Sequence, residues 1–203
     1  MHRWSIVPLV FAIAVCGDTF ANCADSLKAG QPPRVRLATG MGEVVIELDS
    51  AKAPVSTENF ARYVDSGHYD GTIFHRVIAD FMIQGGGFTQ ELAEKPTRAP
   101  IKNEASNGLK NDAYTIAMAR TNDPDSATAQ FFINSKDNDF LNYAGDARPG
   151  YAVFGKVVQG RDVVDRIRKV AVKRSAVSEA QPLEAVVIKK AECVVAADSK
   201  GKK

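Results

Sequence analysis

The chain has 203 residues, of which 45% are hydrophobic and 25% are charged, and its formal net charge is +2. This length suits one well-buried domain, and the composition is typical of a soluble globular protein. A basic tail over residues 196–203 accounts for the small excess of positive charge. The near-neutral body argues against nucleic-acid binding, which needs a clustered basic face.

Residues 1–21 have the pattern of a secretory signal peptide. Arg3 precedes a short apolar stretch over residues 4–16, and the small residues that follow place a cleavage site after Ala21. Cleavage after Ala24 is the alternative. Because a membrane-spanning helix needs ~20 apolar residues, this stretch is too short to cross a membrane. The sequence therefore predicts a periplasmic or secreted protein, without stable membrane insertion after the signal is removed.

The chain has three cysteines, Cys16, Cys23 and Cys193. Cys16 would leave with the signal peptide. Cleavage after Ala21 would keep Cys23 and Cys193, which could form a disulfide, whereas cleavage after Ala24 would leave Cys193 alone. The number of cysteines therefore does not define a disulfide framework. It also gives no metal-ligand cluster, and neither a metal nor a cofactor is expected.

Beyond a linker expected over residues 22–34, one domain is predicted over residues 35–195. Short strand-like runs follow one another, separated by turns. They cover residues 35–39, 43–48, 74–78, 81–84, 114–119, 131–134, 152–158 and about 183–194. One helix is predicted from Pro54, which suits a first helical turn, to a stop near Gly67, and a second over about 162–169. This pattern favours an antiparallel barrel or sandwich with helical caps.

Three stretches carry the functional information. They are FHRVIADFMIQGGGFT (residues 74–89), IAMAR followed by DSATAQFFIN (residues 116–120 and 125–134), and YAVFGKV (residues 151–157). In this order and at these intervals they resemble the bacterial cyclophilins of periplasmic type, which are peptidyl-prolyl cis/trans isomerases. The resemblance implies a mainly β fold, a closed antiparallel eight-stranded barrel capped by two helices. It also implies a shallow outer groove that binds proline-containing segments.

The reaction of this family breaks no covalent bond. Rotation about an X–Pro bond must overcome a barrier of ~18–20 kcal/mol, and the nitrogen lone pair becomes available as the amide twists. A catalyst therefore needs an apolar pocket for the proline ring, a grip on the flanking backbone and a donor to that lone pair. Arg76 matches the family's catalytic arginine, whose planar guanidinium offers several donors in fixed geometry.

The resemblance assigns the remaining site residues. Catalytic positions match Arg76, Phe81, Gln84 and Phe132, and substrate-binding positions match Met82, Ala119, Arg120, Gln130, Phe140, Leu141 and Tyr151. Phe81, Met82, Phe132 and Leu141 would form the proline pocket, although composition alone would place them in an ordinary core. The two glutamines would hold the substrate backbone and orient Arg76.

Neighbouring residues receive other interpretations. Phe131 and Phe132 are adjacent and must face opposite sides of a strand, so that Phe131 is left for the core. His75 should point away from Arg76 and be structural. The Gly85–Gly87 run is expected to allow a turn and close backbone approach, because it lacks the lysine and helix of a phosphate loop.

Three positions depart from many eukaryotic members. Arg120 stands where they have asparagine, Phe140 where they have tryptophan and Tyr151 where they have histidine. We expect catalysis to persist, because the contact at Arg120 is largely made by backbone, and we expect weaker binding of the inhibitor cyclosporin.

The sequence thus predicts a monomeric isomerase that speeds X–Pro rotation during the folding of exported proteins. Its partners would be proline-containing, unfolded or flexible polypeptides. A proline-peptide-binding chaperone or scaffold that uses the same groove is the alternative. A ligand-binding barrel of lipocalin type is a further rival, which would require a hollow interior.

Overall fold

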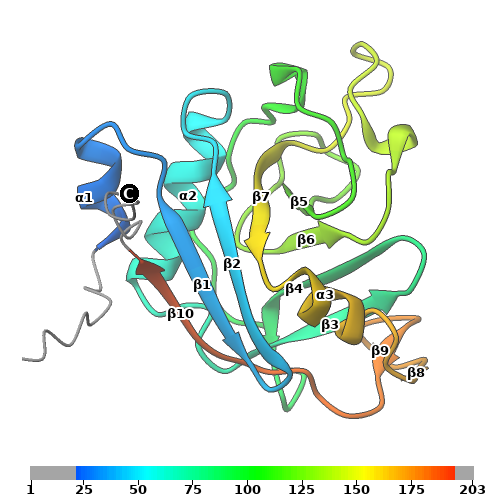
Figure 1. Cartoon of the computed structure of the whole chain (residues 1–203). Helices are drawn as coiled ribbons and strands as arrows, with labels where there is room; N and C mark the ends of the chain where they lie inside the picture. The colour runs from blue at the N-terminus through cyan, green and yellow to red at the C-terminus, as the bar shows by residue number, and fades with distance from the viewer. Residues whose placement is uncertain (1–21, 195–203) are drawn as a thin grey trace, which may run out of the picture.

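The computed structural model describes residues 22–194, so the predicted signal peptide and basic tail lie outside the described residues. An eight-stranded antiparallel sheet dominates the structure (Figure 1). Its strands are β1 (Arg34–Thr39), β2 (Gly42–Leu48), β3 (Thr72–Ile78), β4 (Met82–Thr89), β5 (Thr115–Met118), β6 (Phe131–Asn134), β7 (Val153–Gln159) and β10 (Ile188–Val194). Each predicted run overlaps one of these strands, and the mainly β class is confirmed.

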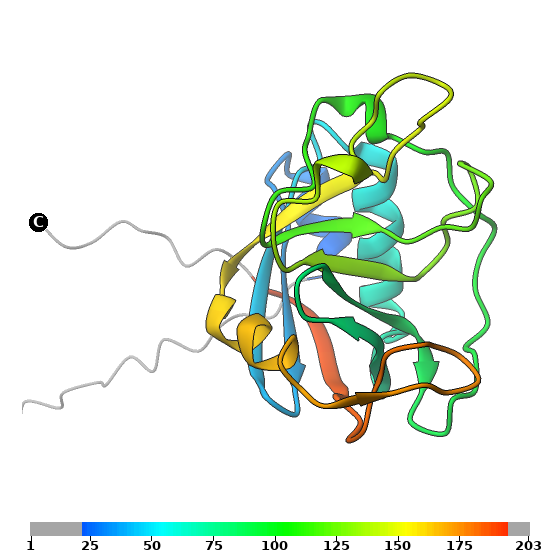
Figure 2. The same ribbon diagram turned by 90° about the vertical axis from the view of Figure 1, so that its right-hand side faces the viewer.

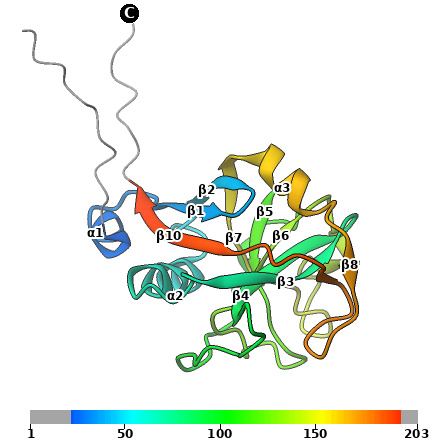
Figure 3. The same ribbon diagram turned by 90° about the horizontal axis from the view of Figure 1, so that it is seen from below.

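The sheet is strongly curled. Its strands pair in the order β10-β1-β2-β7-β5-β6-β4-β3, and Figure 3 shows the two edge strands, β10 and β3, brought near one another. An isolated bridge joins Ile73 to Val187, and the Phe74 N–H donates to the Val186 carbonyl at 3.0 Å. Together with a hydrogen bond from the Gly71 N–H to the Ile188 carbonyl at 2.8 Å, these isolated contacts join the edges without a continuous ladder. The sheet is therefore a half-barrel, and the continuous closure implied by the resemblance is not seen in the pairing of the described strands.

In the part of the chain that the structure describes, three α-helices accompany the sheet: α1 (Cys23–Lys28), α2 (Pro54–Asp65) and α3 (Arg161–Ile167). Figure 2 shows α2 and α3 at different sides of the sheet. α2 begins at Pro54 as predicted, and the Glu104 carboxylate accepts from the N–H groups of Val55 and Ser56 at 3.0 and 2.8 Å. These first-turn donors have no partner within a helix, so a side chain from a distant loop caps α2. Within residues 22–194, no helix is long and apolar enough to cross a membrane.

Smaller elements complete the chain. They are the 3-10 turns η1 (Ala105–Asn107) and η2 (Asp139–Leu141), and a hairpin of β8 (Val172–Lys173) and β9 (Gln181–Pro182). The last predicted strand, about 183–194, was too long at its start, because β10 begins only at Ile188. The hairpin that precedes it was not predicted at all.

Side chains fill the interior of the curled sheet. The ring of Phe60, from α2, lies 5.4 Å from that of Phe131, 5.2 Å from that of Phe154 and 5.0 Å from that of Tyr69. All four residues are fully buried. This packed interior argues against the ligand-binding barrel, which would need an open cavity in the same place.

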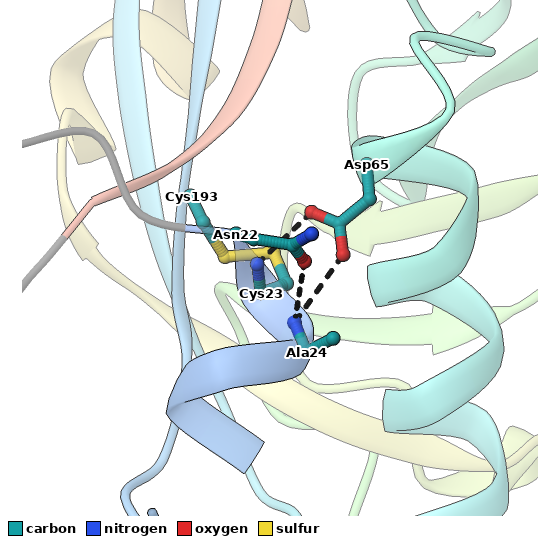
Figure 4. Close-up of a disulfide and its surroundings, with 5 residues drawn as sticks. All are labelled: Asn22, Cys23, Ala24, Asp65 and Cys193. Carbon is teal, nitrogen blue, oxygen red and sulfur yellow. Dashed lines mark hydrogen bonds between the residues drawn. A yellow bond between two sulfur atoms is a disulfide. The ribbon is translucent and has the colours of Figure 1, made fainter. Parts of the chain in front are cut away.

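The N-terminal segment differs from the expected linker. α1 lies within residues 22–34, and Cys23 in this helix forms a disulfide with Cys193 of β10 (Figure 4). The Asp65 carboxylate, at the end of α2, accepts from the N–H groups of Cys23 at 2.9 Å and Ala24 at 3.2 Å (Figure 4). A helix of six residues is unstable alone and depends on such tertiary contacts, which is why local sequence did not reveal it.

Candidate active site

Neighbouring strands bring the predicted residues together by register. Arg76 on β3 pairs with Gln84 on β4, Gln84 with Phe132 on β6, and Phe132 with Ala117 on β5. Residues paired across neighbouring strands stand on the same face of a sheet. These positions therefore form a row across the outer face, opposite the packed interior.

A groove with a volume of about 310 Å³ lies over this row. It is lined by Arg76, Phe81, Met82, Gln84, Ala119, Arg120, Phe132, Phe140, Leu141 and Tyr151. Gln130 borders an adjoining hollow that shares Gln84, Ala119 and Arg120 with the groove. The structure thus gathers every predicted site residue on one continuous surface, while their individual roles stay predictions.

The floor and walls of the groove are apolar. Met82, Phe132 and Leu141 are buried in a cluster separate from the main core. The ring of Phe81 stacks on that of Phe140, with centroids 5.5 Å apart, although Phe140 is 67% exposed. Phe131 lies in the main core, as expected from strand alternation. Such a surface suits the ring of a proline residue.

Arg76 supplies the positive charge at the groove. Its Nε donates to Glu179 Oε1 at 2.7 Å, and its Nη1 lies 3.7 Å from Met82 Sδ. Its Cζ lies 5.7 Å from the ring centre of Phe81. Glu179 therefore holds the Nε edge of the guanidinium, and the Nη1 atom lies over the apolar floor.

The two glutamines bond one another, and their predicted role in orienting Arg76 stays a prediction. Gln84 Nε2 donates to Gln130 Oε1 at 3.0 Å. Glu179 bonds Arg76. Sequence reasoning missed this residue because it lies in a loop far from every recognised stretch, and no local motif marks it.

The side chain of Arg120 organises the groove's edge. Its Nε and Nη2 donate to the Gly150 carbonyl at 3.1 and 2.9 Å, and its Cζ lies 4.3 Å from the ring centre of Tyr151. Arg120 thus fastens the loop that carries Tyr151. The backbone N–H of the preceding residue, Ala119, donates to the Gln130 carbonyl at 3.0 Å.

His75 faces away from this groove, as predicted. It is only 3% exposed and its ring meets that of Phe88 with centroids 4.8 Å apart. Burial, and secondarily the charge of Arg76, lowers the pKa of His75 to about 4. The imidazole is therefore neutral at physiological pH, in agreement with a structural role.

The glycine run lies inside β4, so the predicted turn was wrong. The close approach was correct. A Cβ atom on Gly86 would lie 2.8 Å from the Tyr69 ring, and one on Gly87 would lie 2.7 Å from the Gln130 side chain. The absence of a side chain at Gly87 thus makes room for the glutamine pair. Within residues 22–194, no group of three or more His, Cys, Asp or Glu side chains could hold a metal ion.

Comparison with known proteins identifies the family. The family described as cyclophilin type peptidyl-prolyl cis-trans isomerase/CLD matches residues 34–193. Peptidyl-prolyl cis-trans isomerase cyp18 of Streptomyces antibioticus is 60% identical over 160 residues, which cover 78% of this chain and 96% of that protein. Peptidyl-prolyl cis-trans isomerase B of Escherichia coli (strain K12) is 54% identical over 156 residues, 76% of this chain and 95% of that protein. The crystal structure of a Cryptosporidium parvum cyclophilin type isomerase superposes with a TM-score of 0.67 at 25% identity, covering 82% of this chain and 99% of that one.

Proposed function

The chain belongs to the cyclophilin-type peptidyl-prolyl cis-trans isomerase family, and we propose that it catalyses X–Pro rotation in the outer groove beside Arg76. The observation that carries this assignment is the position of the guanidinium, whose Nη1 lies over the apolar floor at Met82. A cation held beside an otherwise apolar pocket suits a proline ring whose nitrogen must accept a hydrogen bond.

The mechanism follows from the electronic change in the amide. In the planar ground state the nitrogen lone pair is delocalised, and it becomes an acceptor only as the bond twists. An Nη–H of Arg76 then donates to it, so this interaction is stronger in the transition state than in the substrate. A charge-assisted hydrogen bond of ~1.5–3 kcal/mol accelerates rotation roughly ten- to a hundredfold.

The rest of the groove fixes the substrate. Phe81, Met82, Phe132 and Leu141 hold the proline ring while the preceding residue rotates. Gln84 Oε1 and Gln130 Nε2, the two amide atoms outside the mutual bond, are available to the substrate backbone. No proton is transferred, and the substrate is a flexible proline-containing segment that can reach an outer surface.

Exchange spectroscopy by NMR on a short X–Pro peptide tests this function. The protein should accelerate cis/trans exchange, Arg76→Ala should lose roughly a hundredfold, and Arg76→Lys should recover little, because an ammonium cannot reproduce the planar fork. Arg62→Ala is the matched control, since Arg62 is an exposed, ion-paired arginine on α2. Full activity in folded Arg76→Ala would contradict the proposed role.

We further propose that the protein acts outside the cytoplasm, on exported polypeptides. The Cys23–Cys193 disulfide supports this location, because such bonds persist mainly in oxidising compartments. It also favours cleavage of the signal peptide after Ala21, since cleavage after Ala24 would remove Cys23.

Mass spectrometry of the exported protein tests this second proposal. The mature chain should begin at Asn22 and yield a disulfide-linked peptide pair containing Cys23 and Cys193. A chain that keeps residue 1 and carries free thiols would overturn the proposal, and a chain that begins at Asp25 would overturn the assigned cleavage site.

A further inference from the structure

Glu179 forms an ion pair with Arg76 but does not line the groove. We infer that Glu179 is a positioning residue, which fixes the guanidinium of Arg76 in the orientation that presents its Nη atoms to the proline nitrogen. This inference rests on the proposed function, because it requires Arg76 to act on the substrate.

The geometry divides the guanidinium into two functional edges. Glu179 Oε1 accepts from Nε at 2.7 Å, whereas Nη1 is 3.7 Å from Met82 Sδ on the groove floor. Because a guanidinium is planar and rigid, a hydrogen bond at Nε sets the direction of both Nη atoms. A carboxylate at this edge thus orients the donors without occupying them.

The carboxylate is itself held in place by its backbone. The residue that follows it, Ala180, accepts at its carbonyl from the N–H of Val77 at 2.8 Å, and Val77 is the residue after Arg76. The Ser178 hydroxyl accepts from the Ala180 N–H at 3.1 Å, which orders the same loop. The Val77–Ala180 hydrogen bond joins the sequence neighbours of Arg76 and Glu179, which brings these two residues side by side.

The electrostatics favour the ion pair at neutral pH. The carboxyl group of Glu179 is charged at neutral pH, and its own backbone N–H and the guanidinium of Arg76 lower its pKa further. Its side chain is 48% exposed and that of Arg76 is 27% exposed. An arginine this accessible has several rotamers open to it, and the ion pair restricts them before the substrate arrives.

A simple surface ion pair would have a different consequence. Exposed ion pairs contribute little to folding stability. A pair with no further role would also leave catalysis unchanged. A positioning role predicts the same small effect on stability, but the exchange rate should fall.

Peptide exchange measured by NMR on single and double variants distinguishes these roles. Glu179→Ala should lower the catalysed exchange rate roughly five- to tenfold, while Glu179→Gln, which can still accept from Nε, should lose about twofold. Glu184→Ala, at an exposed carboxylate in the same region, should match the unmodified protein. All of these variants should retain the urea midpoint of the unmodified protein.

The double variant separates this inference from the proposed function. If Glu179 acts through Arg76, Glu179→Ala should add nothing to Arg76→Ala, and the Arg76 Nε–H resonance should move toward those of exposed arginines in Glu179→Ala. Additive losses, or unchanged exchange in Glu179→Ala, would overturn the positioning role while leaving the groove assignment intact. An active Arg76→Ala variant would instead overturn the proposed function and with it this inference.

Discussion

The N-terminal clip is the Cys23–Cys193 disulfide together with the Asp65 contacts to α1. The groove and this clip both join residues that are distant in the sequence, but they differ in exposure. In Figure 1, α1 lies at the left edge and strands β4 to β6, which carry much of the groove, lie to the right. The groove keeps polar groups accessible, at Arg76 and the glutamines, whereas the clip buries its cysteines. From this contrast we expect catalysis to depend on the groove and stability to depend on the clip.

Removal of the disulfide should have the largest effect. The bond joins residues separated by 170 positions, and a closed loop of this size restricts the unfolded chain strongly. Replacing both Cys23 and Cys193 by serine should lower the free energy of unfolding by about 4 kcal/mol. Urea denaturation of the oxidised protein and of this double variant measures the difference. A loss below about 1 kcal/mol would show that the clip contributes little to stability.

Acid should lower the free energy of unfolding through His75 on β3, and it should leave the disulfide bond intact. The pKa of His75 is about 4 when folded, against about 6.5 when unfolded, so the unfolded state binds the extra proton between these values. This contribution to stability is complete above pH 6.5 and is lost as the pH falls toward 4, by about 3 kcal/mol in total.

Urea denaturation at several pH values checks this expectation with His75→Gln. The variant should show a smaller loss of stability between pH 6.5 and 5 than the unmodified protein. Some slope should remain, because burial also lowers the pKa of His68. An unchanged slope would exclude His75 as the source.

The stacked rings of the groove should differ in importance. Phe81 lies partly buried on the groove wall, whereas Phe140 is 67% exposed. Phe81→Ala should lower kcat/KM about tenfold, and Phe140→Ala should lower it less than about threefold, because less apolar contact is lost. Steady-state kinetics on a proline peptide compares them, and the reverse order would place the proline ring elsewhere.

The smallest effect is expected from the polar part of the clip. Asp65→Ala removes the side-chain acceptor of the Cys23 N–H and one of the two acceptors of the Ala24 N–H, which also donates to Asn22 Oδ1. The change should cost about 1 kcal/mol of unfolding free energy in the oxidised protein. Asp49→Ala, at a carboxylate that caps a different turn, is a useful comparison. A change in exchange rate with Asp65→Ala would argue against the separation of the two regions.

The two regions also differ in how far the sequence predicts them. Strand alternation and the resemblance predicted one surface for Arg76, Phe132 and the other groove residues, and the structure brings them together there, while their roles stay predictions. Alternation and resemblance could not reveal Glu179 or α1, because both depend on contacts between distant segments without a local pattern. The disulfide was undecided because the sequence left open whether cleavage falls after Ala21, which keeps Cys23, or after Ala24, which removes it. Sheet closure depends on how far the strands curl, which residue patterns do not specify.

The most direct test of the separation is X–Pro peptide exchange by NMR in three proteins kept at a temperature where all are folded. The unmodified protein and the Cys23→Ser, Cys193→Ser double variant should accelerate exchange equally, while Arg76→Ala should be nearly inactive. This result would assign catalysis to the groove and stability to the clip. A folded double variant with the activity of Arg76→Ala, or an active Arg76→Ala, would contradict it.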